Sequence, residues 1–176
     1  PFLIAIGKTL SELLVYADRT PEEMPGMGFE KAFGLWETLV RLLRQAQGNQ
    51  VLSINDLYPS CIRKFKDLNL VLGAVPYEFV SRATVNEIKN NVFYHLGDNN
   101  PGFDLLCRTT CSRRKKFFFV YVLRRNASSH LTNEEIVDRN DCVVPSQIPE
   151  NCIVLDLQSL RAAFGPSLSD RLFLQL

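Results

Sequence analysis

Apolar residues recur at helical spacing most clearly between Phe29 and Gly48. They step by four, three, four and three positions, which places them on one helix face: Phe29, Phe33, Trp36, Val40 and Leu43. The charged residues of this segment fall on the other side and are expected in solvent: Glu30, Lys31, Glu37, Arg41 and Arg44. The pattern predicts an amphipathic helix that buries Trp36 with its apolar neighbours and ends at Gly48.

Two further helices are predicted on either side of this one. Residues 2–18 carry apolar residues at helical spacing, namely Leu3, Ile6, Leu10, Leu13 and Leu14. The prolines and glycine of residues 20–26 cannot continue that helix, so this segment is a linker. After a short extended piece, Ser53 or Asn55 can cap a third helix that runs to Leu68.

A long fourth helix is predicted over residues 77–96, ended by the turn-forming residues 97–102. Its inner face would carry Phe79 or Val80, followed by Val85, Ile88, Val92 and Leu96. Its polar face would carry Arg82, Asn86, Lys89 and Asn90.

Two strands joined by a basic turn are predicted next. Residues 103–110 alternate imperfectly, residues 117–123 are β-branched and aromatic, and the polar residues 111–116 connect them. The tail is expected to contain a short helix capped by Thr132, a strand at 152–157, a helical turn at 159–164 and a final strand at 171–176.

The order of these elements between residues 28 and 125 resembles a winged helix: helix, strand, helix, helix, strand, basic turn, strand. The resemblance is one of architecture, with no signature in residue identities. We expect an α+β fold in three parts. These are an N-terminal helix and linker at 1–26, a winged-helix-like core at 27–126 and a C-terminal α/β extension packed on the core at 127–176.

Length and composition are typical of a soluble globular domain. The chain has 176 residues, of which 46% are hydrophobic and 22% charged. The longest apolar run, residues 117–123, is far shorter than the roughly 20 residues of a membrane-spanning helix. Five cysteines cannot all pair internally, which favours reduced thiols and an intracellular location, nucleus or cytoplasm. Because residue 1 is Pro and no signal-peptide pattern follows it, we expect a fragment of a larger protein.

Basic residues are concentrated in the predicted hairpin. Residues 108–125 carry +7 and no acidic residue; since the whole chain carries +1, the remainder carries −6. Such a wing could neutralise nucleic-acid phosphates or dock an acidic protein; alternatively, its charges keep a flat apolar strand from aggregating. The candidate binding residues are Arg108, Arg113, Arg114, Lys115, Lys116, Arg124 and Arg125, with Arg82, Asn86 and Lys89 on the predicted fourth helix.

The sequence offers little for catalysis or metal binding. Cys107 and Cys111 form one close pair, whereas zinc sites usually need two, so we interpret them as buried structural thiols. His95 is expected to be packed at a helix end. No cofactor is predicted. A nuclease-like site could be assembled from Asp104, Asp156 and Lys115 or Lys116.

We therefore expect a non-catalytic interaction domain that binds protein partners and has no membrane segment. Its basic hairpin is the expected contact surface and has nucleic acid as a second ligand. A dedicated DNA- or RNA-binding winged helix is the first alternative, and a nuclease-like enzyme fragment is the second. The near-neutral total charge favours the interaction domain, because a dedicated nucleic-acid binder is usually basic throughout.

Overall fold

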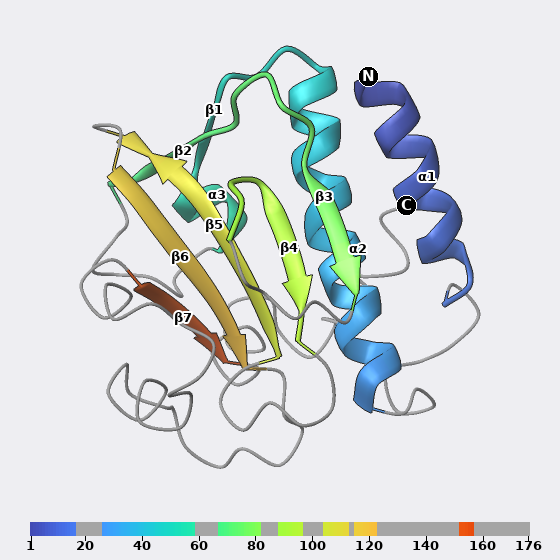
Figure 1. The fold of residues 1–176 in the computed structure, drawn as a ribbon. Coiled ribbons are helices and arrows are strands. Elements are labelled where there is room, and N and C mark those ends of the chain that lie inside the picture. Colours follow the sequence, from blue (N-terminus) through green and yellow to red (C-terminus); the bar gives the residue numbers. More distant parts are fainter. Residues whose placement is uncertain are drawn as a thin grey trace.

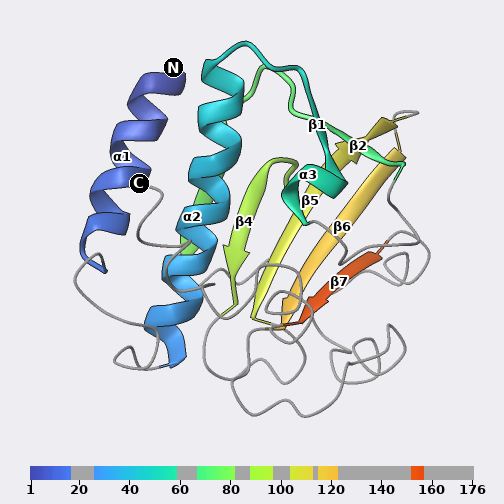
Figure 2. The same cartoon turned by 180° about the vertical axis from the view of Figure 1, so that it is seen from behind.

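Helices and a mixed β-sheet form two layers in the computed structural model (Figures 1 and 2). The structure describes residues 1–16, 26–58, 67–81, 88–96, 104–112, 115–122 and 152–156. Helices α1 (Phe2–Leu14) and α2 (Gly26–Ala46) lie side by side on one face of the sheet, and the single turn α3 (Ile54–Leu57) follows the first strand. The α+β class is thus confirmed. Among the described ranges, no helix is long and apolar enough to cross a membrane.

The sheet is built around its long strand β5 (Leu105–Cys111). The other strands are β1 (Val51–Ser53), β2 (Asn69–Val71), β3 (Glu78–Ser81), β4 (Val92–His95), β6 (Lys115–Val122) and β7 (Cys152–Asp156). Along one side, β5 pairs with β6 over its whole length. The other side is divided, because β4 pairs with residues 105–107 and β2 with residues 110–111. Outside these, β1 joins β2, while β3 and β7 lie parallel to β4 and β6.

The second helix forms as predicted, but its burial differs from the predicted stripe. Phe29 and Phe33 are buried, Trp36 and Val40 are half-buried, and Leu43 is 43% exposed. Further buried positions lie around the helix, at Ala32, Leu35, Leu39 and Leu42. The helix is buried widely because it packs against α1 on one side and against the sheet on another (Figure 1).

Two charged residues expected in solvent are instead buried on α2. Arg41 is 1% exposed and Glu37 is 6% exposed. The prediction that they lie on a solvated face is therefore wrong. An apolar stripe read at helical spacing identifies the helix, but it does not show whether a second layer covers the polar side.

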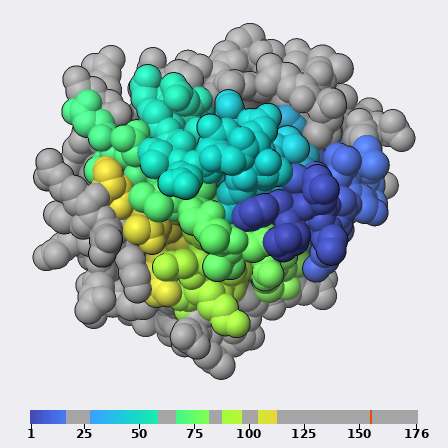
Figure 3. All heavy atoms as spheres, turned by 90° about the horizontal axis from the view of Figure 1, so that it is seen from above, coloured from blue at the N-terminus to red at the C-terminus, as the bar shows by residue number. Residues whose placement is uncertain are grey.

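The first helix is confirmed over Phe2–Leu14 and is followed by a turn at Val15 and Tyr16. Its packed face carries Thr9 and Leu13, with Phe2, Ala5, Ile6 and Leu10 half-buried beside them. Two of the predicted inner residues, Leu3 and Leu14, are exposed. Seen from above, α1 (dark blue) lies against the cyan end of α2 and the green residues that include β3 (Figure 3).

The helix predicted over residues 77–96 is wrong where the structure describes it. Residues 78–81 form β3 and residues 92–95 form β4, and the two strands pair in parallel. In β4, Phe93 and His95 face α2, so the alternation of a strand prevails over the weaker helical spacing. Asn91 has a φ of 61°, a left-handed conformation that no continuous helix contains. The described residues of this segment, 77–81 and 88–96, therefore do not form the helix that a winged helix would place here.

The predicted hairpin is confirmed as strands β5 and β6, which pair antiparallel from Leu105↔Tyr121 to Cys111↔Lys115. Of the predicted third helix, the structure describes one turn, Ile54–Leu57, with Ser53 at its N-cap position, and residues 59–66 lie outside the described residues. Asn69, just beyond the predicted end, begins β2. In the tail, β7 confirms the strand predicted at 152–157. The other tail elements, predicted at Thr132, 159–164 and 171–176, lie outside the described residues.

Candidate functional site

The predicted basic residues fall into two groups in the structure. Lys115 and Lys116 are the first residues of β6, opposite Cys111 and Thr110, and Arg108 is half-buried on β5. Lys89 is exposed in the segment that leads into β4. The remaining candidates lie outside the described residues: Arg82, Asn86, Arg113, Arg114, Arg124 and Arg125.

Arg108 lies beside Asn90, the residue that follows Lys89, although the sequence predicted the two segments as separate elements. The Nε of Arg108 donates to Oδ1 of Asn90 at 2.7 Å, and the backbone N–H of Asn91 donates to the carbonyl of Arg108 at 2.9 Å. Asn90 also forms a parallel bridge with Arg108. The guanidinium is thereby held at Asn90, whose neighbour in the chain, Lys89, is exposed. We call Lys89, Arg108 and Lys116 the basic surface; the neighbouring Lys115 pairs with Cys111 and therefore belongs to the other face of the sheet.

The register of the hairpin relates the two parts of this surface. Thr110 pairs with Lys116 and Arg108 pairs with Phe118. Since residues two apart on a strand share a face, position 116 lies on the same sheet face as Arg108. That face is opposite α2, because Cys107 and Cys111, the odd-numbered neighbours, belong to the core beneath the helix. The structure thus places candidates from two stretches of the sequence on one side of the sheet.

The nuclease-like set is divided between opposite ends of β6. Asp104 directly precedes β5, and Asp156 ends β7 opposite Val122, so both aspartates lie near the C-terminal end of β6. Lys116 lies six residues earlier, about 20 Å along the strand. A lysine that assists a metal-bound carboxylate pair must lie within contact distance of it. These residues therefore do not form one site.

A buried polar cluster is the main feature that sequence reasoning missed. Nη1 of Arg41 donates to Oε2 of Glu37 at 2.7 Å and to the Glu37 carbonyl at 3.0 Å. Nη2 of Arg41 contacts the Tyr58 hydroxyl at 3.2 Å, and that hydroxyl donates to the same Glu37 oxygen. The guanidinium carbon lies 4.8 Å from the centre of the Phe93 ring and 5.8 Å from that of Tyr77. The spacing of four residues between Glu37 and Arg41 predicts an ion pair on a helix, but it does not show whether that pair is buried or on the surface.

The thiols of β5 are held protonated next to this cluster. Burial raises the pKa of both Cys107 and Cys111 to about 12. Burial also raises the pKa of Tyr77, whose hydroxyl bonds to the Thr109 hydroxyl at 2.8 Å. A protonated, buried thiol is a poor nucleophile and a poor metal ligand. Within the described ranges, no three His, Cys, Asp or Glu side chains are grouped so that they could hold a metal ion.

His95 is completely buried at the end of β4, a strand rather than the predicted helix end. Its Nε2 lies 2.8 Å from Oε2 of Glu30 on α2. Since an ionised carboxylate can only accept, Nε2 donates the hydrogen of this bond. Nδ1 is buried and has no hydrogen-bond partner among the residues that the structure describes. The pair joins α2 to the sheet.

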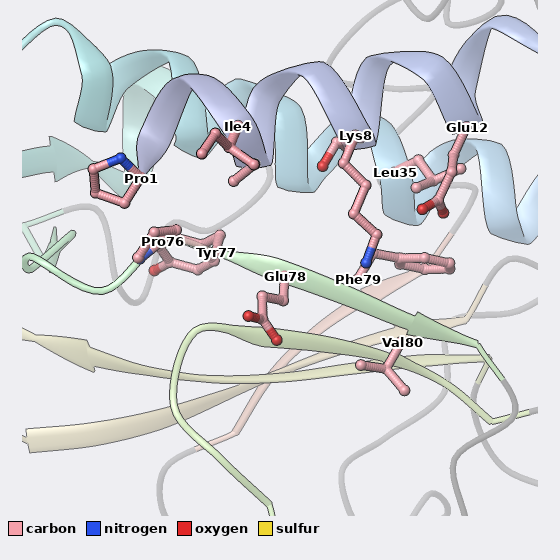
Figure 4. A pocket seen from close by; sticks show the side chains of 12 residues that line it. Pro1, Ile4, Lys8, Glu12, Leu35, Pro76, Tyr77, Glu78, Phe79 and Val80 are labelled. Carbon is pink, nitrogen blue, oxygen red and sulfur yellow. The ribbon is translucent and has the colours of Figure 1, made fainter.

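A groove separates α1 from the edge strand β3 (Figure 4). Its volume is about 320 Å³. The lining includes Ile4, Lys8 and Glu12 of α1, Leu35 of α2, and residues 76–80 in and before β3. No sequence pattern marks this groove, because its two walls are about seventy residues apart in the chain.

Comparison with known proteins adds no assignment to this geometry. No family model, no curated protein and no solved structure matches the chain. The basic surface and the groove are therefore interpreted from their own chemistry.

Proposed function

We propose that this chain is a non-catalytic interaction domain of a larger protein, which binds an acidic protein partner through the basic surface. The observation that carries the proposal is the fixed position of Arg108. Asn90 holds its guanidinium, the backbone of Asn91 fixes the strand beneath it, and Lys89, which precedes Asn90 in the chain, is exposed. A positioned arginine loses less conformational freedom when it binds a carboxylate, and its planar fork matches that ligand.

The charge distribution supports a partner with a limited acidic patch. The segment 108–125 carries +7, while the rest of the chain carries −6. A local positive field of this kind attracts an acidic surface and accelerates its association. A long polyanion such as nucleic acid would also contact the rest of the chain, and the negative charge there would repel it. The balance of charge therefore favours an acidic protein surface.

Nucleic acid is the second candidate ligand, because the same lysines and Arg108 could neutralise phosphates. Residues 78–81 and 92–95 form strands and not the recognition helix of a winged helix. Such binding would therefore use contacts to the sugar-phosphate backbone and would not depend on the base sequence. A nuclease-like activity would need a catalytic set other than Asp104, Asp156 and the hairpin lysines.

The proposal is tested with a pair of matched double variants. Lys115→Gln/Lys116→Gln removes two positive charges from the hairpin, and Lys31→Gln/Arg44→Gln removes two from α2. The probes are a fluorescein-labelled glutamate-rich peptide and a labelled DNA duplex, with binding followed by anisotropy at low and physiological salt. We expect the hairpin variant to bind the peptide several-fold more slowly and the α2 variant to bind it normally.

The outcomes separate the two ligands. If the duplex binds more tightly than the peptide, and the hairpin variant lowers its salt slope by about 0.9 per lost phosphate contact, nucleic acid is the ligand. If both variants behave like the unaltered protein with both probes, the charges of the hairpin serve solubility alone and the proposal is wrong.

A further inference from the structure

The outer edge of β3 is free of strand partners within the described part of the chain. Among the described strands, β3 pairs with β4 alone, and the N–H of Glu78 donates to the Asn91 carbonyl at 3.0 Å. Parallel pairing uses alternate residues, so Glu78 and Val80 bond towards β4 while the backbone groups of Phe79 and Ser81 face outward. Such an edge is a template for a further strand.

Helix α1 extends past this edge and covers the position that a further strand would occupy (Figures 1 and 2). It packs on α2 through Leu13, yet Ile4 is 79% exposed and lines the groove with Leu35 and Phe79. The layer of helices therefore extends beyond the described sheet at β3 (Figures 1 and 2). The groove of about 320 Å³ is the space that this mismatch leaves under α1 (Figure 4).

We propose that the groove between α1 and β3 binds an extended segment of a partner protein, which adds to the sheet as a strand beside β3. Outward N–H and C=O groups of Phe79 and Ser81 would supply its main-chain hydrogen bonds. Every second side chain of the segment would point under α1, where Ile4 and Leu35 favour an apolar residue. The site is separate from the basic surface and does not depend on the function proposed for it.

Charge further specifies the segment. Two carboxylates, Glu12 and Glu78, line the groove against one ammonium group, Lys8, and none of the three forms an ion pair among the described residues. Glu78 is exposed on the sheet face opposite Phe79. A Lys or Arg opposite Glu78 would complete a cross-strand pair. The partner segment should thus alternate apolar and polar residues and carry a basic residue on its polar side.

The test uses two equally exposed residues of α1 as a matched pair. Ile4 and Leu3 are both 79% exposed, and of the two Ile4 lines the groove. Peptides selected from a phage-displayed library of random 12-residue sequences serve as the probe, with affinity measured by anisotropy. We expect Ile4→Glu to weaken binding about tenfold or more and Leu3→Glu to leave it within about twofold. Thermal melting of both variants checks that each is folded.

A second readout reports strand addition directly. Bound peptide should slow amide hydrogen exchange at Phe79 and Ser81, and Ser81→Pro, which removes an outward N–H, should weaken binding. The proposal is overturned if no selected peptide distinguishes Ile4→Glu from Leu3→Glu, or if these two amides exchange equally fast with peptide bound. It is also overturned if the free chain sediments as a dimer that Ile4→Glu separates, because the occupant is then a second copy.

Discussion

Arg41 is the largest side chain that the described core buries completely. Removing a guanidinium from water costs several kcal/mol, and the surrounding groups offset this cost: the Glu37 carboxylate, the Tyr58 hydroxyl and two aromatic faces. Such a cluster specifies how α2 sits on the sheet, since the three groups satisfy one another in a single arrangement.

Breaking this cluster should be more harmful than replacing all of it. Glu37→Gln leaves the arginine uncompensated and should lower the free energy of unfolding by about 3–5 kcal/mol. The triple variant Glu37→Leu/Arg41→Met/Tyr58→Phe removes every polar group together, and we expect it to be more stable than Glu37→Gln alone. Urea unfolding measures both. If the changes in unfolding free energy of Glu37→Leu, Arg41→Met and Tyr58→Phe, measured singly, add up to that of the triple variant, the three residues are not coupled.

The two buried thiols predict a loss of stability at alkaline pH. Their pKa rises from an ordinary value of 9.0 to about 12, so the unfolded chain releases protons that the folded chain keeps. The free energy of unfolding should therefore fall as pH increases from about 9 to about 12. Cys107→Ala/Cys111→Ala should show a shallower fall over this range, measured by denaturant unfolding at each pH. An equal slope in both proteins would argue against thiols held protonated by burial.

At the scale of elements, the close approach of α2 to β3 depends on Gly34. A Cβ at this position would lie 2.4 Å from Cε2 of Phe79 and 3.2 Å from Cδ2 of Leu105, closer than atoms normally pack. Gly7 of α1 is the matched case, because a Cβ there meets nothing within 4 Å.

Alanine at these two glycines should have opposite effects. Gly7→Ala should stabilise the protein by about 0.4–1 kcal/mol, since alanine restricts the unfolded chain and favours the helix. Gly34→Ala gains the same helical preference but must displace β3, so it should destabilise by about 1–3 kcal/mol. Thermal and urea unfolding of the two variants provide the comparison. Stabilisation by Gly34→Ala would show that α2 and β3 leave room for a Cβ at position 34.

The elements that the sequence predicted well are those whose periodicity is local. Phe29 and Phe33 identified α2, and the aromatic run after Lys116 identified β6. The segment 77–96 was predicted wrongly because its fold depends on distant contacts. Gln45 of α2 binds the carbonyls of Leu72 and Val75 and the N–H of Tyr77, and this directs the chain into β3. No local pattern contains that information.

At the scale of the molecule, the two candidate sites differ in how far the sequence could identify them. The hairpin part of the basic surface was predictable, because its charges are contiguous in the sequence. Its link to Lys89 was not, since it depends on the Asn90–Arg108 contact between segments. The groove could not be predicted from the sequence. Ile4 and Phe79 both line it, but they are brought there by the way the helix layer packs on the sheet.

The divided side of β5 also orders the events of biosynthesis. Strands β2 and β4 do not pair with each other, and β5 is the strand that joins them. When residues 1–96 have left the ribosome, the chain contains the strands of two pairs, β1–β2 and β3–β4, which share no ladder until β5 follows. Until Cys111 emerges, the apolar underside of α2 lacks its central strand, and the nascent chain exposes the surface that chaperones recognise.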